Sequence, residues 1–270
     1  MAQRFIMGLA LSLLIGGLGY RRGALSASGV AGAVLVGTAV FAFGGWGWGV
    51  LLVLFFASSS ALSRFRARAK ERVAEKFAKG TRRDLGQALA NGGLGALLAV
   101  ASTLWPSPLW FAAFVGAMAA VNADTWATEV GVLATRPPRL ISTGRRVPPG
   151  TSGGVSLLGT AAALAGAACI GAVAALCAWA VGMAAPGAYL PGGAVSGLAG
   201  ALADSLLGAT VQGIYWCPAC GKETERRMHA CGTPTQPLRG RAWLSNDWVN
   251  FAASLVGAGV GVMLLSISAG

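Results

Sequence analysis

Charged residues are scarce in this sequence. Asp, Glu, Lys and Arg together make up 11% of the 270 residues, whereas 55% are hydrophobic. Soluble globular domains contain about a quarter charged residues, so the composition excludes an ordinary soluble domain. Acids are the rarer charge, because nine Asp and Glu oppose 21 Lys and Arg and leave a net charge of +12. The bases lie in short loops between apolar runs, which indicates membrane orientation rather than binding of nucleic acid.

Three further features are missing. No G-x-x-x-x-G-K-[ST] segment occurs, which excludes a P-loop. No A-x-A cleavage site directly follows the first apolar run, Phe5–Gly19, which Arg21 and Arg22 close instead. This run therefore predicts a first membrane span rather than a cleaved signal peptide. His229 is the only histidine, so it cannot be both a metal ligand and a general base.

Long runs rich in Leu, Ala, Val and Gly predict membrane-spanning helices. About 20 mainly apolar residues suffice for one span. We expect eight spans, at residues 4–20, 28–44, 46–63, 87–104, 109–133, 153–182, 190–212 and 247–267. The sequence thus predicts an all-α, polytopic transmembrane bundle that forms one integral membrane domain over 1–270, with a cytoplasmic loop insert at 213–245. The division of 28–63 into two spans depends on a break, which Gly44, Gly45, Gly47 and Gly49 favour.

The distribution of positive charge decides between seven and eight spans. Four groups of bases lie at 21–22, 64–83, 136–146 and 222–241, and they hold 20 of the 21 bases. Eight spans place all four groups on one side of the membrane, whereas seven would put the first group opposite the others. We therefore expect cytoplasmic basic loops and both termini outside, in the inner or plasma membrane of a bacterial cell. Bases beyond those that set orientation suit anionic headgroups or substrate phosphates.

Ionisable residues inside membrane spans are costly and mark candidate functional sites. Asp124 and Glu129 fall in the fifth span, Asp204 in the seventh and Asp247 at the start of the eighth. All four lie in the cytoplasmic half, together with the amides Asn91, Asn122, Gln212, Asn246 and Asn250. Hard divalent cations prefer carboxylate and amide oxygens, so we expect a cytoplasm-facing pocket that binds Mg²⁺. The simpler alternative is hydrogen bonding between helices by neutral groups.

Helical spacing adds detail to this pocket. A straight helix cannot aim Asp124 and Glu129 at one point, so either the helix breaks or only one of them serves the site. Gly197, Gly200, Asp204 and Gly208 follow one stripe, which predicts close helix packing with a carboxylate at the contact.

Loops beside the pocket are candidates for phosphate binding. Segment 148–156 opens the sixth span with glycines and hydroxyls, namely Thr151, Ser152, Gly153 and Gly154. A helix N-terminus offers free N–H groups to an anion, although the same residues suit an N-cap and turn. Arginines at the same membrane edge are placed to contact phosphate oxygens or are plain loop charges: Arg82, Arg83, Arg145 and Arg146.

A cluster of soft ligands lies in the seventh loop. Cys217, Cys220, His229 and Cys231 fall within fifteen residues. A Cys₃His set suits a tetrahedral structural zinc ion, and disulfides are rare in the cytoplasm. A redox C-x-x-C pair and unliganded thiols are the alternatives.

Four ordered motifs resemble the domain-of-unknown-function 92 family, which includes transmembrane protein 19 and the plant phytyl-phosphate kinase. They are 122–131, 149–156, 197–208 and 246–250, and the similarity spans nearly the whole chain. The resemblance implies an isoprenoid-phosphate kinase that converts a prenyl monophosphate to its diphosphate with Mg²⁺ and a nucleoside triphosphate, CTP being the expected donor.

Under this interpretation Asp204 and Asp247 hold Mg²⁺, and Asp124 or Glu129 completes the site. Substrate or nucleotide would contact the arginines, the 151–154 turn and the polar residues Asn91, Asn122, Ser205, Gln212, Asn246 and Asn250. A cytidylyltransferase that makes a CDP-lipid would use the same metal site. A proton- or cation-coupled transporter would instead need polar groups reaching both sides, yet the outer halves of the spans are apolar. A scaffold without catalysis is the fourth possibility.

Overall fold

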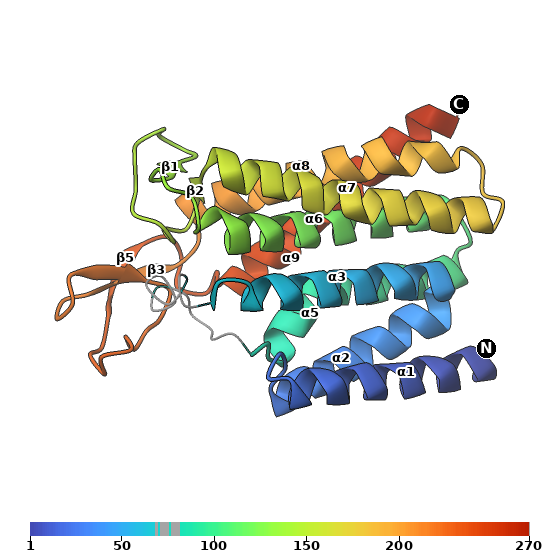
Figure 1. Ribbon diagram of the computed structural model, residues 1–270, viewed down its shortest axis with the longest axis horizontal. Coiled ribbons are helices and arrows are strands. Elements are labelled where there is room, and N and C mark those ends of the chain that lie inside the picture. The colour runs from blue at the N-terminus through green and yellow to red at the C-terminus, as the bar shows by residue number, and fades with distance from the viewer. Residues whose placement is uncertain (68–69, 71–75, 77–81, 270) are drawn as a thin grey trace.

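The fold was analysed in a computed structural model that describes residues 1–67, 70, 76 and 82–269. Within these residues, eight α-helices form a bundle with roughly aligned axes (Figure 1). They are α1 (Ala2–Arg21), α2 (Ala27–Ala39), α3 (Trp46–Arg64), α5 (Leu85–Leu104), α6 (Leu109–Gly131), α7 (Leu157–Ala180), α8 (Tyr189–Thr210) and α9 (Asn246–Ala269). The predicted all-α membrane bundle is confirmed.

Among the described residues, seven helices are long and apolar enough to cross a membrane. The fifth expected span, α6, is not one of these seven helices, because polar residues such as Asn122 and Asp124 lower its mean hydropathy. This helix lies in the middle of the bundle, where it packs against α3, α5, α7, α8 and α9. Every α6 residue from Phe111 to Ala123 is buried. The helix that carries both Asp124 and Glu129 is thus covered by other helices along most of its length.

Segment 28–63 is divided into two helices, as its glycines predicted. Helix α2 continues into a π-helical turn, η1 (Val40–Gly44), and the chain reverses at Gly45. Gly45 has a φ of 83°, in the region that favours glycine. The rings of Phe41 and Trp46 pack edge to face across the turn, with centroids 4.6 Å apart. The expected break is therefore a structural feature of the hairpin.

Figure 1 shows both termini at one end of the bundle and the short strands at the other, which we call the polar end. There β1 (Arg139–Leu140) pairs with β2 (Gly154–Val155), and β3 (Ile214–Cys217) lies between β4 (Lys222–Thr224) and β5 (Gln236–Arg239). We call residues 213–245, which contain β3, β4 and β5, the Cys/His lobe. The assignment of the polar end to the cytoplasm stays a prediction, and Arg68, Arg72 and Lys79 of the second basic group lie outside the described residues.

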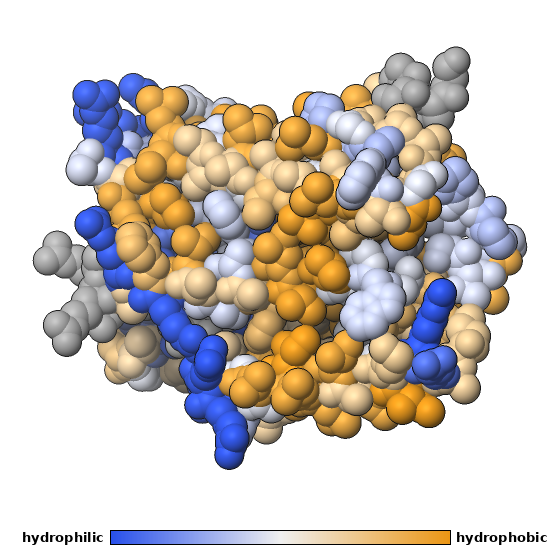
Figure 2. Space-filling view, turned by 45° about the vertical axis from the view of Figure 1, so that its right-hand side comes forward, coloured by the Kyte–Doolittle hydropathy of each residue, from blue (hydrophilic) through white to orange (hydrophobic). Residues whose placement is uncertain are grey.

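Hydrophobic side chains cover much of the outer surface (Figure 2). Leu35, Leu97, Leu176 and Met263 are each exposed by 60% or more, although they come from four different helices. A soluble monomer rarely exposes so much contiguous apolar surface. These faces are therefore suited to lipid.

Small residues let the inner helices approach closely. A Cβ atom at Gly116 would overlap the carbonyl oxygen of Gly257 on α9, and one at Gly200 would overlap Ala120 on α6. Such backbone proximity is typical of membrane helix interfaces. Of the predicted glycine stripe of α8, Gly197 and Gly200 lie directly against α6, whereas Gly208 lies against Ser152 and Gly153 of the loop before α7.

The Gly116→Ala substitution is expected to lower the thermal unfolding midpoint of the detergent-solubilised protein, since overpacking costs about 1–3 kcal/mol. Gly17→Ala on α1 is the matched control, because a Cβ atom at Gly17 would meet nothing within 4 Å. Equal midpoints for the two variants would contradict the close contact of α6 with α9.

Candidate functional site

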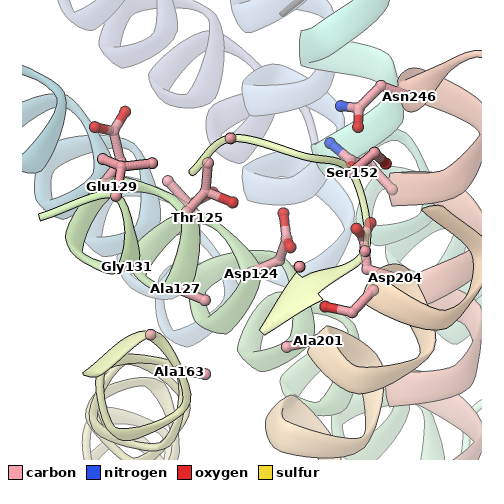
Figure 3. Close-up of a pocket in the computed structure, with 18 of the residues that line it drawn as sticks. Asp124, Thr125, Ala127, Glu129, Gly131, Ser152, Ala163, Ala201, Asp204 and Asn246 are labelled. Carbon is pink, nitrogen blue, oxygen red and sulfur yellow. The ribbon is translucent and has the colours of Figure 1, made fainter. Parts of the chain in front are cut away.

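A cavity of about 550 Å³ opens at the polar end, lined by α5, α6, α8, α9 and loop 149–156. All four acids expected from the sequence line it: Asp124 and Glu129 from α6, Asp204 from α8 and Asp247 from α9. Figure 3 shows Asp124 and Asp204 side by side on two helices, with Ser152 and Asn246 beside the same space. Acids from three helices are thus brought to a single cavity.

Most of the expected binding residues line the same cavity. They are Asn91, Thr151, Ser152, Gly153, Gly154, Ser205, Asn246 and Asn250. The amide of Asn250 lies 3.1 Å from Asn91 Oδ1. In the orientation in which its nitrogen faces α8, Asn250 donates a hydrogen bond to Asp204 Oδ2 at 2.9 Å. These contacts connect α5, α8 and α9 at the depth of Asp204.

Four of the expected binding residues do not line the cavity, namely Asn122, Arg145, Arg146 and Gln212, and Gln212 is described separately below. Asn122 is fully buried, where it donates to the Gly166 carbonyl on α7 and accepts from Ser58 Oγ on α3. It therefore acts as a link between helices, which was the simpler alternative. Arg145 and Arg146 are exposed on the loop between β1 and β2, outside the cavity lining.

Glu129 and Asp124 have different surroundings. Lys70 Nζ lies 2.6 Å from one Glu129 carboxylate oxygen, and Ser63 Oγ donates to the other at 2.6 Å. Helix α6 continues unbroken through both acids, and Figure 3 shows Glu129 well apart from Asp124 and Asp204. Of the two alternatives for this helix, the structure therefore favours the one in which only Asp124 joins the other carboxylates.

Glu225 was missed by the reasoning from sequence. It directly follows β4 in the Cys/His lobe and lines the cavity. Both Asp124 and Asp204 experience the electrostatic repulsion of its carboxylate, and they also repel each other. Three acids from α6, α8 and the lobe thus form one group, which we call the carboxylate cluster. No hydropathy signal marks Glu225, because it lies in a loop.

Gln212 lies behind the cavity rather than in its lining. It is buried, and its Nε2 atom donates to Glu225 Oε1 at 2.9 Å. Ser152 Oγ donates to Gln212 Oε1 at 2.8 Å. The expected binding residue thus positions two residues that do line the cavity.

Three cationic side chains line the cavity as well: Lys70, Arg83 and Arg226. Arg83 donates to Ser60 Oγ at 3.2 Å, and burial lowers the pKa of its guanidinium, opposed by the negative charge of Glu129. Arg82 instead donates to the Leu25 carbonyl. Arg83 is thus the member of this pair that reaches the cavity.

The Cys/His lobe gathers its soft ligands. The ligand atoms of Cys217, Cys220, His229 and Cys231 all lie within 4.8 Å of one another. Cys231 Sγ is 3.7 Å from Cys217 Sγ and 3.1 Å from His229 Nδ1. Hydrogen bonds, first with Thr233 and then with His229, lower the pKa of the Cys231 thiol to about 6. A Cys₃His group at these separations fits a tetrahedral metal ion.

Fold and cavity define a polytopic membrane protein with an acidic site at one end of the bundle. The chain belongs to the integral membrane protein family DUF92, whose profile matches residues 10–258. The expected family is thereby confirmed.

Three relatives extend over most of the chain. It is 34% identical to Protein PGR of Arabidopsis thaliana over 274 aligned positions, which cover 94% of this chain and 93% of that protein. It is 30% identical to an uncharacterized membrane protein of Methanocaldococcus jannaschii, covering 89% and 85% of the two chains. An uncharacterized membrane protein of Synechocystis is 29% identical, with coverage of 84% and 78%. No solved structure matches.

Proposed function

We propose that this protein is a membrane phosphotransferase that converts an isoprenoid monophosphate to its diphosphate. The family resemblance supports CTP as the donor. The observation that carries the proposal is the carboxylate cluster of Asp124, Asp204 and Glu225, which lies in a cavity also lined by Lys70 and Arg83. Negative groups for a metal and positive groups for phosphate are the parts that phosphoryl transfer requires.

The carboxylate cluster fits Mg²⁺. Carboxylates that repel one another are stabilised by a shared cation, and Mg²⁺ combines a few carboxylates with substrate phosphates. Asp124, Asp204 and Glu225 would hold the ion, and Asp247 lines the same cavity. When bound, Mg²⁺ would neutralise charge on the transferring phosphoryl group. Compared with the ligands expected from sequence, this set keeps Asp204 and Asp124 and adds Glu225.

The loop before α7 supports phosphate binding beside this cluster. Gly153 has a φ of 81°, and a Cβ atom there would lie 2.5 Å from the Ala209 Cβ atom on α8. This contact holds Thr151 and Ser152 at the cavity. The N-cap of α7 is Ser156, whose Oγ accepts from Gly159 N at 3.1 Å. The 151–154 turn is therefore separate from the cap and presents hydroxyls and backbone to the cavity.

A prenyl phosphate is already an anion, so the reaction needs no strong base. Its catalysis would consist of positioning and charge neutralisation. Arg83 and Lys70 would orient the phosphates, while the amide of Asn250, with its nitrogen facing α8, would hold Asp204 in place. The apolar stretch of α6 from Phe111 to Val121 is buried beyond the cavity, which favours an enzyme over a transport path.

We also propose that the Cys/His lobe binds structural zinc. Four protein donors leave no open position for chemistry. The lobe supplies both the ligand Cys217, in β3, and the cavity residue Glu225, just after the paired strand β4. Zinc would thereby hold Glu225 in the carboxylate cluster.

Product analysis tests the proposed reaction. Purified protein would be incubated with Mg²⁺, each nucleoside triphosphate and either prenyl alcohols or prenyl monophosphates. The products would be identified by mass spectrometry. Prenyl diphosphate together with CDP supports the kinase. A CDP-lipid together with pyrophosphate would instead identify the protein as a cytidylyltransferase. The absence of any product with every pair of substrates would overturn both enzyme hypotheses.

Glu225→Gln is expected to lower turnover about a hundredfold, because it removes one charge from the metal-binding group. Glu223→Gln is the matched control, since Glu223 lies on β4 opposite Trp216 and does not line the cavity. Initial rates at saturating Mg²⁺ provide the measurement. Equal rates for the two variants would remove Glu225 from the proposed site.

A further inference from the structure

An apolar cleft adjoins the cavity, between α1 and α3. We call it the α1–α3 cleft, and side chains of α2 and α5 complete its lining. Its apolar walls include Leu11 and Ile15 from α1, Val36 from α2, and Leu52 and Val53 from α3. The volume of the cleft, about 110 Å³, is far smaller than that of the cavity. The small volume and the apolar walls suit the first segment of a hydrocarbon chain rather than a second polar headgroup.

The cleft and the cavity share three lining residues: Arg83, Gln87 and Asn91. They follow one another at four-residue intervals, and Gln87 and Asn91 therefore lie on one face of α5. The Arg83 guanidinium lies 6.0 Å from the centroid of the Phe56 ring, a wall of the cleft, while the carboxylate of Glu129 acts on it from the cavity side. A cation thus stands where the acidic cavity meets the apolar cleft.

The cleft runs from this junction toward the end of the bundle that holds the termini. Its α3 wall extends from Phe56, at the middle of that helix, back to Gly49, near the helix start, which is roughly 10 Å along the helix at 1.5 Å per residue. The side chain of Val53 is 42% exposed, so the cleft reaches the outer, lipid-facing surface there. A lipid can therefore extend its chain into the cleft without crossing the packed core around α6.

From this geometry we infer that the α1–α3 cleft holds the hydrocarbon tail of a lipid phosphate whose headgroup lies against Arg83. The identity of the lipid as a prenyl monophosphate rests on the proposed function. The cleft itself, the three lining residues that it shares with the cavity and the cation at the junction do not rest on it. A single amphiphile could place its anionic head against Arg83 and its apolar tail between the walls of the α1–α3 cleft. Its phosphate would then face the carboxylate cluster.

Photolabelling tests the position of the tail without requiring turnover. Geranylgeranyl monophosphate with a diazirine on the second isoprene unit from the phosphate would be irradiated with the full-length protein in nanodiscs, and labelled peptides would be identified by mass spectrometry. Labels within α1 and the 49–56 stretch of α3, competed by unlabelled geranylgeranyl monophosphate, support the inference. Labels spread over α7 and α8, or competed equally by phosphatidylglycerol, would overturn it.

A matched pair of substitutions tests the cleft itself. Val53 lines it, whereas Val50 on the same helix does not, and both side chains are 42% exposed. Val53→Trp is expected to weaken competition by geranylgeranyl monophosphate about tenfold. Val50→Trp should leave that competition nearly unchanged, and neither substitution should alter competition by the short dimethylallyl monophosphate. Equal effects of the two substitutions would overturn the tail site. Cleft labelling without any phosphoryl transfer would support the tail site and overturn only the kinase.

Discussion

Asp204→Asn is expected to lower turnover of a prenyl monophosphate about a thousandfold while the protein stays folded. Asp204 is the residue on which the charges of Asp124 and Glu225 both act, and it accepts a hydrogen bond from Asn250 when the amide nitrogen of Asn250 faces α8. Asparagine has the same shape but no charge, so it removes a metal ligand without creating a void. Because the substitution also relieves repulsion within the cluster, the unfolding temperature should not fall.

The measurements are turnover as a function of Mg²⁺ concentration and thermal unfolding in detergent. Glu223→Gln again provides an acid-to-amide control outside the cavity. A folded Asp204→Asn variant with wild-type turnover would refute the metal-binding role of the carboxylate cluster. A loss of turnover accompanied by unfolding would also count against the prediction, because the proposed role is chemical and not structural.

Cys217→Ser is expected to abolish zinc binding and to reduce turnover about a hundredfold. Cys217 is fully buried in β3, and Trp216 and Cys217 pair with Glu223 and Lys222 of β4, the strand that leads to Glu225. Structural zinc supplies much of the folding free energy of small metal-binding units, on the order of 10 kcal/mol in zinc-finger peptides. Without it the lobe would no longer hold Glu225 near α6 and α8.

Metal content by mass spectrometry and turnover of the same preparation test this link. Cys177→Ser is the matched control, since Cys177 lies on α7 outside the lobe. Wild-type protein that contains no zinc at full activity would refute the metal site. Loss of zinc with unchanged turnover would show that zinc is not needed to position Glu225 and that the metal has no role in catalysis.

The helices and the membrane class could be predicted from the sequence because their causes are local. A span needs about 20 apolar residues and backbone hydrogen bonds that are satisfied within the helix, and one continuous segment of sequence meets both requirements. The break at Gly45 and the Cys/His ligand set were likewise predicted from short segments. Hydropathy alone was less informative for α6, whose two acids line the cavity at the polar end.

Within the site, the sequence predicted which acids lie at one end of the bundle, since this level follows from position along a span, and all four line one cavity. Only the tertiary structure decided their partners. Helix rotation and packing depend on contacts between distant segments. They placed Asp124 in the carboxylate cluster and brought Glu129 into a salt bridge with Lys70. The same contacts buried Asn122 between helices. The fold of a loop without periodicity brought Glu225 to the cavity, and no pattern in consecutive residues encodes that meeting.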